Sequence, residues 1–209
     1  MQDIFTLLLN GVLIISVVSF VVMGFRQWRR TNFLARKAHE MQLHFSASDL
    51  FDVPRRYGGF AMISNGHGPR ACNVTHGHVQ KSLVRAFDFR YEVGHATRRE
   101  TRHYAVIAVQ TRMRLGKLVM WHVEDVHATP LSNAPGSRSL GKWICRGDMA
   151  LARVMVEANA LLTDRTVSVE VQDDAILFCL PIEKRRQDYT ESLRCVQHAL
   201  ERIEQYSVQ

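Results

Sequence analysis

The sequence predicts an α+β protein in which a single N-terminal transmembrane helix precedes a cytoplasmic domain of antiparallel β-hairpins covered by helices. Three observations lead to this fold class. An uncharged apolar run fills residues 4–25, residues 83–93 alternate between apolar and charged side chains, and an apolar stripe at helical spacing marks the C-terminal end. Strands mixed with covering helices are typical of α+β domains.

The apolar run at residues 4–25 predicts a membrane anchor. Its 22 residues include no charge. A helix of this length reaches about 33 Å, which is enough to cross a hydrocarbon core of about 30 Å. A cleaved signal peptide fits poorly, because Asp3 precedes the run and no A-x-A pattern follows it. A buried helix of a soluble protein would show a polar face, and this run has none.

Basic residues directly after the run predict the orientation of the chain. No acidic residue occurs among residues 26–37, and basic residues stay on the cytoplasmic side of a membrane. We therefore expect a single pass through the inner (plasma) membrane, with the N-terminus outside and residues 26–209 in the cytoplasm. These charges either set the topology alone or also contact anionic lipids. The predicted membrane-interface residues are Arg26, Trp28, Arg29, Arg30, Arg36 and Lys37.

Composition limits the domain organisation and the classes of partner. The chain has 209 residues, 46% of them apolar, and a formal charge of +7. This predicts an anchor with a basic collar (1–30), an amphipathic helix and linker (31–58), and one cytoplasmic α+β domain (59–209). The basic residues outside the cluster that follows the apolar run are scattered along the sequence. A membrane surface or an acidic protein therefore explains the net charge better than a nucleic acid does. The four cysteines form no C-x-x-C pair and are expected to be free thiols.

Residues 31–45 are expected to continue the anchor as an amphipathic helix that packs on the domain. Its apolar residues follow a spacing of 4, 3 and 4 and are Leu34, Ala38, Met41 and Phe45. The stretch "SASDLFDVPRRYGG" then predicts a break, because proline and paired glycines interrupt it and Ser48 or Asp49 can cap a turn.

The clearest β pattern begins in residues 83–93, where apolar side chains alternate with Asp88, Arg90 and Glu92. A four-residue loop at 94–97 would join this strand to the next. The cross-strand pairs predicted from that loop are Glu92–Arg99, Asp88–His103 and Phe87–Tyr104. With a further strand at 117–123, the region 72–123 is expected to form an antiparallel meander.

The second half of the chain predicts four more elements after a loop at 131–141. They are a short strand at 142–145, a helix at 147–164 with Asp148 as its N-cap, a hairpin at 166–181 that turns at Asp173–Asp174, and a final helix. The stripe of that final helix consists of Tyr189, Leu193, Val196, Leu200 and Ile203. It is expected to pack on the sheet of its own domain, and a partner-binding seam is the alternative.

Two motifs in the β region resemble a loosely defined family of bacterial membrane-anchored proteins. The first is a basic-Asn-hydrophobic-x-x-Gly strand, and the second is an aromatic-Asp-aromatic-x-Tyr strand. The residues that carry them are Arg70, Asn73, Val74, Gly77 and Phe87-Asp88-Phe89-Arg90-Tyr91. The resemblance implies one or two N-terminal membrane helices followed by a β-rich domain, and it implies no particular chemistry.

Histidines and one aspartate are the candidate metal-binding and catalytic residues. His67, His76 and His78 are close in sequence. In a strand, His76 and His78 would point to the same face, and a third zinc ligand could come from His95 or His103. No H-E-x-x-H occurs and no carboxylate adjoins these residues, so exposed histidines are the simpler interpretation. Asp88 is more easily explained by cross-strand pairing than by catalysis. We therefore expect no catalytic residue, no metal and no cofactor.

A basic strip with little opposing charge forms the remaining candidate surface. It would contact an acidic partner or anionic lipid, or it would simply be a solvated face of the sheet. Its residues are Arg98, Arg99, Arg102, Arg112, Arg114 and Lys117.

Together these features predict a non-enzymatic accessory or scaffolding subunit that caps the cytoplasmic face of a membrane protein complex. The expected partners are integral membrane proteins and anionic lipids. The topology also resembles that of the H subunit of photosynthetic reaction centres, without shared motifs, and respiratory complexes are equally compatible. The alternatives are a membrane-tethered metal-dependent hydrolase and a sensor of anionic lipid or pH.

Overall fold

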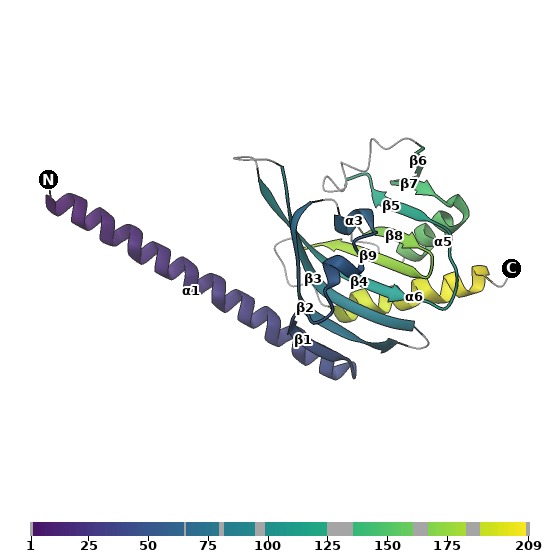
Figure 1. Cartoon of the computed structure of the whole chain (residues 1–209), viewed down its shortest axis with the longest axis horizontal. Helices are drawn as coiled ribbons and strands as arrows, with labels where there is room; N and C mark the ends of the chain where they lie inside the picture. Colours follow the sequence, from purple (N-terminus) through teal and green to yellow (C-terminus); the bar gives the residue numbers. More distant parts are fainter. Residues whose placement is uncertain are drawn as a thin grey trace.

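A computed structural model describes residues 2–64, 66–79, 82–94, 99–124, 136–160, 167–182 and 189–207. Helix α1 (Gln2–Glu40) runs without interruption through the apolar run and beyond it. Its N-terminal part projects away from the rest of the chain (Figure 1), and the large apolar side chains from Ile4 to Phe25 are exposed. By length and composition, α1 is the one helix within these ranges that could cross a membrane. A lipid environment would cover this surface.

The strands within the described ranges form one antiparallel sheet with the order β1-β2-β3-β4-β9-β8-β5-β7-β6. Strands β1 to β5 comprise His44–Ser48, His67–Val79, Ser82–Val93, Glu100–Gln110 and Leu118–His122. Strands β6 to β9 comprise Arg138–Leu140, Trp143–Gly147, Ser168–Gln172 and Ala175–Pro181. The domain is therefore α+β, as the sequence predicts.

Each face of the sheet buries its own hydrophobic core. On one face, α5 (Met149–Ala160), α6 (Tyr189–Ser207) and Leu34 of α1 pack on the sheet. The second core lies on the other face, beneath α2 (Val53–Arg56), α3 (Ala61–Ser64) and the residues between them. Aromatic side chains of β3 and β4 fill much of this second core. Figure 1 shows α5 and α6 side by side on the sheet.

Several local predictions are confirmed. Asp148 caps α5, because its Oδ1 atom accepts hydrogen bonds from the amides of Ala150 and Leu151 at 2.9 and 3.1 Å. Asp173 adopts a φ of 53° in the turn between β8 and β9. The described residues of the C-terminal stripe pack on the domain's own sheet and are Leu193, Val196, Leu200 and Ile203. Cys72 and Cys145 are free thiols.

The predicted meander over 72–123 is wrong in its last step. Strand β5 does not pair with β4, because β9 lies beside β4 and β8 lies between β9 and β5. The apolar residues of β9 are divided between the two cores, with Ile176 and Phe178 in one and Leu177 in the other. A strand that is buried on both faces belongs in the centre of a sheet, and this position separates β4 from β5.

The predicted register between β3 and β4 is wrong by two residues. Glu92 lies opposite Thr101, Asp88 opposite Ala105 and Phe89 opposite Tyr104. The strands end at Val93 and Glu100, so six residues separate them rather than four. Because the shift is even, each side chain still points to the predicted face.

The segments at 31–45 and 131–141 also differ from their predictions. Helix α1 ends at Glu40, and Phe45 contacts the first core from edge strand β1 instead of from a helix. Residues 138–140 form strand β6 at the opposite edge, whereas residues 131–135 lie outside the described ranges. Both edge strands are short, which limits pairing with other chains and makes their sequence patterns weak.

Candidate functional site

Helix α1 is joined to the sheet by an ion pair between Arg30 and Asp88. The guanidinium of Arg30 donates two hydrogen bonds to the carboxylate of Asp88, from Nε to Oδ2 at 2.7 Å and from Nη2 to Oδ1 at 2.5 Å. The two side chains are 21% and 11% exposed. Bidentate arginine–carboxylate pairs of this kind fix relative orientation as well as position.

A β-bulge in β2 places a second polar side chain, that of Asn73, beside the Arg30–Asp88 ion pair. The register of β2 and β3 shifts between Cys72 and Thr75, and Asn73 at the shift has a φ of 52°. Asparagine tolerates this left-handed conformation better than most residues do. Its Nδ2 atom donates to Asp88 Oδ2 at 2.8 Å, and its Oδ1 atom accepts a hydrogen bond from Thr31 Oγ1 at 2.9 Å.

We call Arg30, Thr31, Asn73 and Asp88 the junction network. Counted over the whole residue, backbone included, Asn73 is 1% exposed and Asp88 is 8% exposed. A carboxylate in such a place is costly unless charge and hydrogen bonds compensate for its lost hydration, and the network provides both. The electrostatic environment extends to Cys72, where burial and the nearby charge of Asp88 raise the pKa of the thiol.

The junction network fixes the domain close to the end of the apolar run. Only residues 26–29 separate Phe25 from Arg30, which corresponds to about 6 Å of helix. Residues 31–40 then lie on the domain, where Leu34 and Ala38 are 0% and 1% exposed. The helix and the sheet are thus connected by a packed helical segment and not by a flexible linker.

The predicted membrane-interface residues separate into three groups. Arg26, Trp28 and Arg29 are exposed before the junction network, and Trp28 stacks on Phe25 with ring centroids 5.8 Å apart. Arg30 instead binds the sheet. Arg36 is exposed and Lys37 pairs with Glu40 at 2.7 Å, both on the part of α1 that lies along the domain.

The predicted basic strip does not form one surface. Arg99 and Arg102 lie at the start of β4, where they pair with Glu92 at 3.4 Å and with Glu100 at 3.2 Å. Arg112, Arg114 and Lys117 are exposed beyond its other end. Residues 103–110 of β4 lie between the two groups, which at about 3.3 Å per residue is about 26 Å. Arg98 lies outside the described residues.

The histidine candidates are also spread along one strand. His67 begins β2, whereas His76 and His78 lie near its other end. Among the described residues, no group of three potential metal ligands comes together; His95 lies outside them. The neighbours of His76 are instead the rings of His44, at 5.2 Å, and Phe51, at 4.7 Å.

The imidazole of His76 predicts sensitivity of the fold to acid. Its Nδ1 atom is buried without a hydrogen-bond partner in the described structure, and burial, His44 and Arg85 lower its pKa. In the unfolded chain this group takes up a proton near pH 6.5. Because the folded state resists that proton, we expect stability to fall as the pH drops below about 6.5.

Urea unfolding of the full chain in detergent at pH 7.5 and 5.5 would measure this effect. The variant His76→Gln should lose part of the difference between the two pH values. The exposed His78 on the same strand provides the matched control, and His78→Gln should retain the whole difference. Equal pH dependence in all three proteins would refute the assignment to His76.

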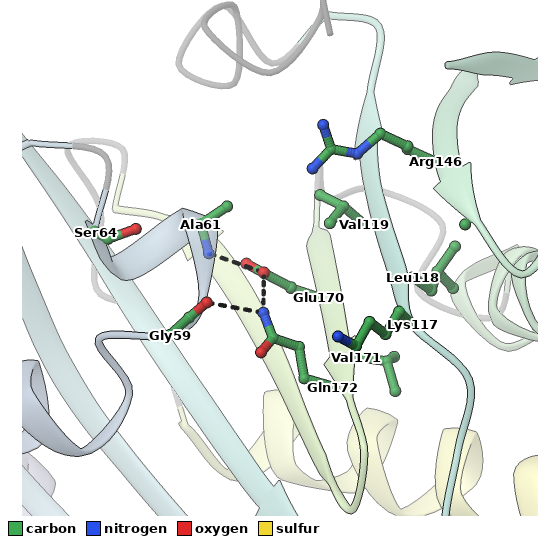
Figure 2. Close-up of a pocket in the computed structure, with 11 residues that line it drawn as sticks. Gly59, Ala61, Ser64, Lys117, Leu118, Val119, Arg146, Glu170, Val171 and Gln172 are labelled. Atoms are coloured by element: carbon green, nitrogen blue, oxygen red, sulfur yellow. Dashed lines mark hydrogen bonds between the residues drawn. The ribbon is translucent and has the colours of Figure 1, made fainter. Parts of the chain in front are cut away.

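A separate hollow of about 370 Å³ lies between α3 and strands β5, β7 and β8. Figure 2 shows Glu170 beneath α3, with Lys117 and Arg146 across the hollow. The carboxylate of Glu170 accepts hydrogen bonds from the amides of Ala61 and Met62, at 2.8 and 2.9 Å, and is 1% exposed. Gln172 bridges Glu170 Oε1 and the carbonyl of Gly59, both at 2.9 Å. These contacts hold α3 on the sheet.

Sequence reasoning missed Thr31 and Glu170 and gave Asp88 the wrong partner. One signal for Asp88 was available, because an acidic residue between two core phenylalanines needs a strong partner. Nothing in the local pattern identifies that partner as Arg30, which is 58 residues away. Glu170 alternates with valines and therefore has the pattern of a solvent-facing residue.

Comparisons with known proteins indicate a fold and no family. Neither models of protein families nor the sequences of curated proteins match this chain. A solved structure, the mycobacterial trehalose monomycolate transport factor A, TtfA, is similar with a TM-score of 0.58. The match covers 83% of this chain and 94% of that chain at 15% sequence identity. At this identity the likeness concerns the fold alone, and it leaves the resemblance to the bacterial motif family a prediction.

Proposed function

We propose that this protein is a non-enzymatic accessory subunit of an integral membrane assembly. Its α1 helix crosses the membrane, and its sheet domain is held against the cytoplasmic surface as a rigid contact module. The observation that carries this proposal is the junction network, because an anchor that served only as a tether would not need a bidentate ion pair and a bulge asparagine.

The orientation in this proposal rests on charge. Arg26, Arg29 and Arg30 follow the apolar run, whereas the residues before it include only Asp3 as a charged side chain. The positive-inside rule then places the domain in the cytoplasm. Digestion of residues 26–209 by a protease added to intact cells would contradict this orientation.

The similar fold of TtfA supports a role in membrane transport over the other complexes that the topology allows. That protein is described as a transport factor, and the likeness covers most of both chains. No observation supports the resemblance to the reaction-centre H subunit. We therefore propose that the partners are integral membrane proteins that move a substrate across or along the membrane.

Purification of the full chain from native membranes in a mild detergent, followed by mass spectrometry, tests the proposal. We expect integral membrane proteins to be recovered in stoichiometric amounts. Recovery of the chain as a lone monomer, under conditions that preserve other membrane complexes, would contradict it. Zinc bound in stoichiometric amount would instead favour a hydrolase.

A further inference from the structure

A row of basic side chains crosses three strands at the end of the sheet beyond the junction network. The register places Arg70 of β2 directly opposite Arg90 of β3, and Arg90 directly opposite His103 of β4. Directly opposed residues point to the same face of a sheet. All three are exposed, and Arg90 shares its face with Asp88, two residues earlier.

This arrangement is unfavourable for the isolated domain. Like charges directly opposite each other destabilise a strand pair, and no ion pair within the described ranges includes Arg70 or Arg90. The acidic residues at this end are already engaged, since Glu92 pairs with Arg99 and Glu100 with Arg102. The row therefore offers positive charge to an anion from outside the domain.

The direction of α1 places this row on the membrane side of the domain. Arg30 of α1 contacts Asp88 of β3. Leu43, just beyond the end of α1, lies against Gly77 of β2. Gly77 is paired with Val84, which comes before Asp88 in β3. The helix therefore runs antiparallel to β3, and residues before Arg30 lie toward Arg90. Arg26 is one helical turn before Arg30 and on the same side of α1. The end of the sheet that carries the row extends on the side from which α1 enters (Figure 1).

We propose that Arg70, Arg90, His103 and Arg26 form a contact surface for the headgroups of anionic phospholipids. The inference rests on the proposed membrane anchoring of this chain and names a second partner for the same module. Guanidinium groups bind phosphate oxygens in a bidentate geometry. Attraction to an anionic surface is short-ranged, with a screening length of about 8 Å in physiological salt. The junction network holds the row on the side of the domain from which the apolar run extends.

Arginine modification of the full chain in nanodiscs tests the surface. The chain is reconstituted in phosphatidylcholine alone or with one part in three phosphatidylglycerol, and phenylglyoxal modification is mapped by mass spectrometry. We expect Arg70 and Arg90 to react about tenfold more slowly in the anionic nanodiscs, and high salt should remove the difference. Arg112 and Arg114 are exposed beyond the far end of β4 and should react equally in both lipids.

A pair of charge-matched variants provides the second measurement. The double variant Arg70→Gln/Arg90→Gln should retain less phosphatidylglycerol after purification in mild detergent, whereas Arg112→Gln/Arg114→Gln should retain as much as the parent chain. Equal modification rates in the two lipids, or equal lipid loss in the two variants, would overturn the proposal. If protein partners co-purify while Arg70 and Arg90 are unaffected by lipid, this inference alone fails. If a lone monomer shows the lipid effect, the subunit proposal fails instead.

Discussion

Replacing Asp88 by alanine is expected to reduce the free energy of unfolding of the domain by about 3 kcal/mol. The substitution leaves the guanidinium of Arg30 without its carboxylate in a largely buried place, and it removes the acceptor of Asn73 Nδ2. Donors that stay buried without a partner cost about 1–3 kcal/mol each. The loss should therefore exceed that of an ordinary surface ion pair, which contributes about 0–1 kcal/mol.

Urea unfolding of the full chain in detergent would measure this loss, with Arg30→Ala and the double variant completing a thermodynamic cycle. We expect the two single substitutions to couple by more than about 1 kcal/mol, as is usual for partners in one buried network. Glu157→Ala provides the control, because this carboxylate is exposed on α5 and its removal should change stability by less than about 0.5 kcal/mol. Equal effects at Asp88 and Glu157 would show that the ion pair contributes little.

Asp88→Ala also tests whether the junction network is needed to hold the domain in a fixed orientation, or whether attachment through α1 is enough. In Asp88→Ala the apolar run of α1 is unchanged, so the chain should still insert into the membrane. If a fixed pose of the domain is needed for docking, recovery of protein partners should fall below the level found with Glu157→Ala. Unchanged recovery in a folded Asp88→Ala chain would show that the partners recognise α1 alone.

The features that could be predicted from the sequence are those set by neighbouring residues. The N-cap at Asp148, the turn at Asp173 and the packed face of α6 each depend on contacts within a few residues or on one amphipathic period. The anchor candidate likewise follows from an uninterrupted apolar run. Local chemistry at these places agrees with the final fold, as minimal frustration requires.

The features that were missed depend on pairs that are distant in sequence. The apolar run in β4 indicates a buried strand but does not show that β9, about 70 residues later, is its neighbour. Arg30 follows an apolar run and has the pattern of a membrane-interface residue, so its partner on β3 could not be found locally. The candidate site therefore depends on tertiary structure, although the sequence singles out Arg30 and Asp88 separately for other roles.

Replacing Gly147 by alanine is expected to destabilise the sheet strongly. Gly147 ends β7 opposite Leu118 and has a φ of 112°, a conformation that residues with a side chain rarely adopt. A Cβ atom here would overlap the backbone carbonyl oxygen of Lys117. That oxygen also accepts the amide of Asp148 at 2.9 Å, so the start of α5 depends on it.

Two costs should therefore add in Gly147→Ala. Backbone strain contributes about 1–3 kcal/mol, and displacement of the β5–β7 pair contributes a similar amount, which together predict a loss of about 4 kcal/mol. Gly141→Ala isolates the first cost, because Gly141 also has a positive φ, 61°, but a methyl group added there would meet no atom within 4 Å. Urea unfolding should show a loss of about 1 kcal/mol for this control. If the two variants lose the same stability, the close approach of β7 to Lys117 does not constrain the sheet.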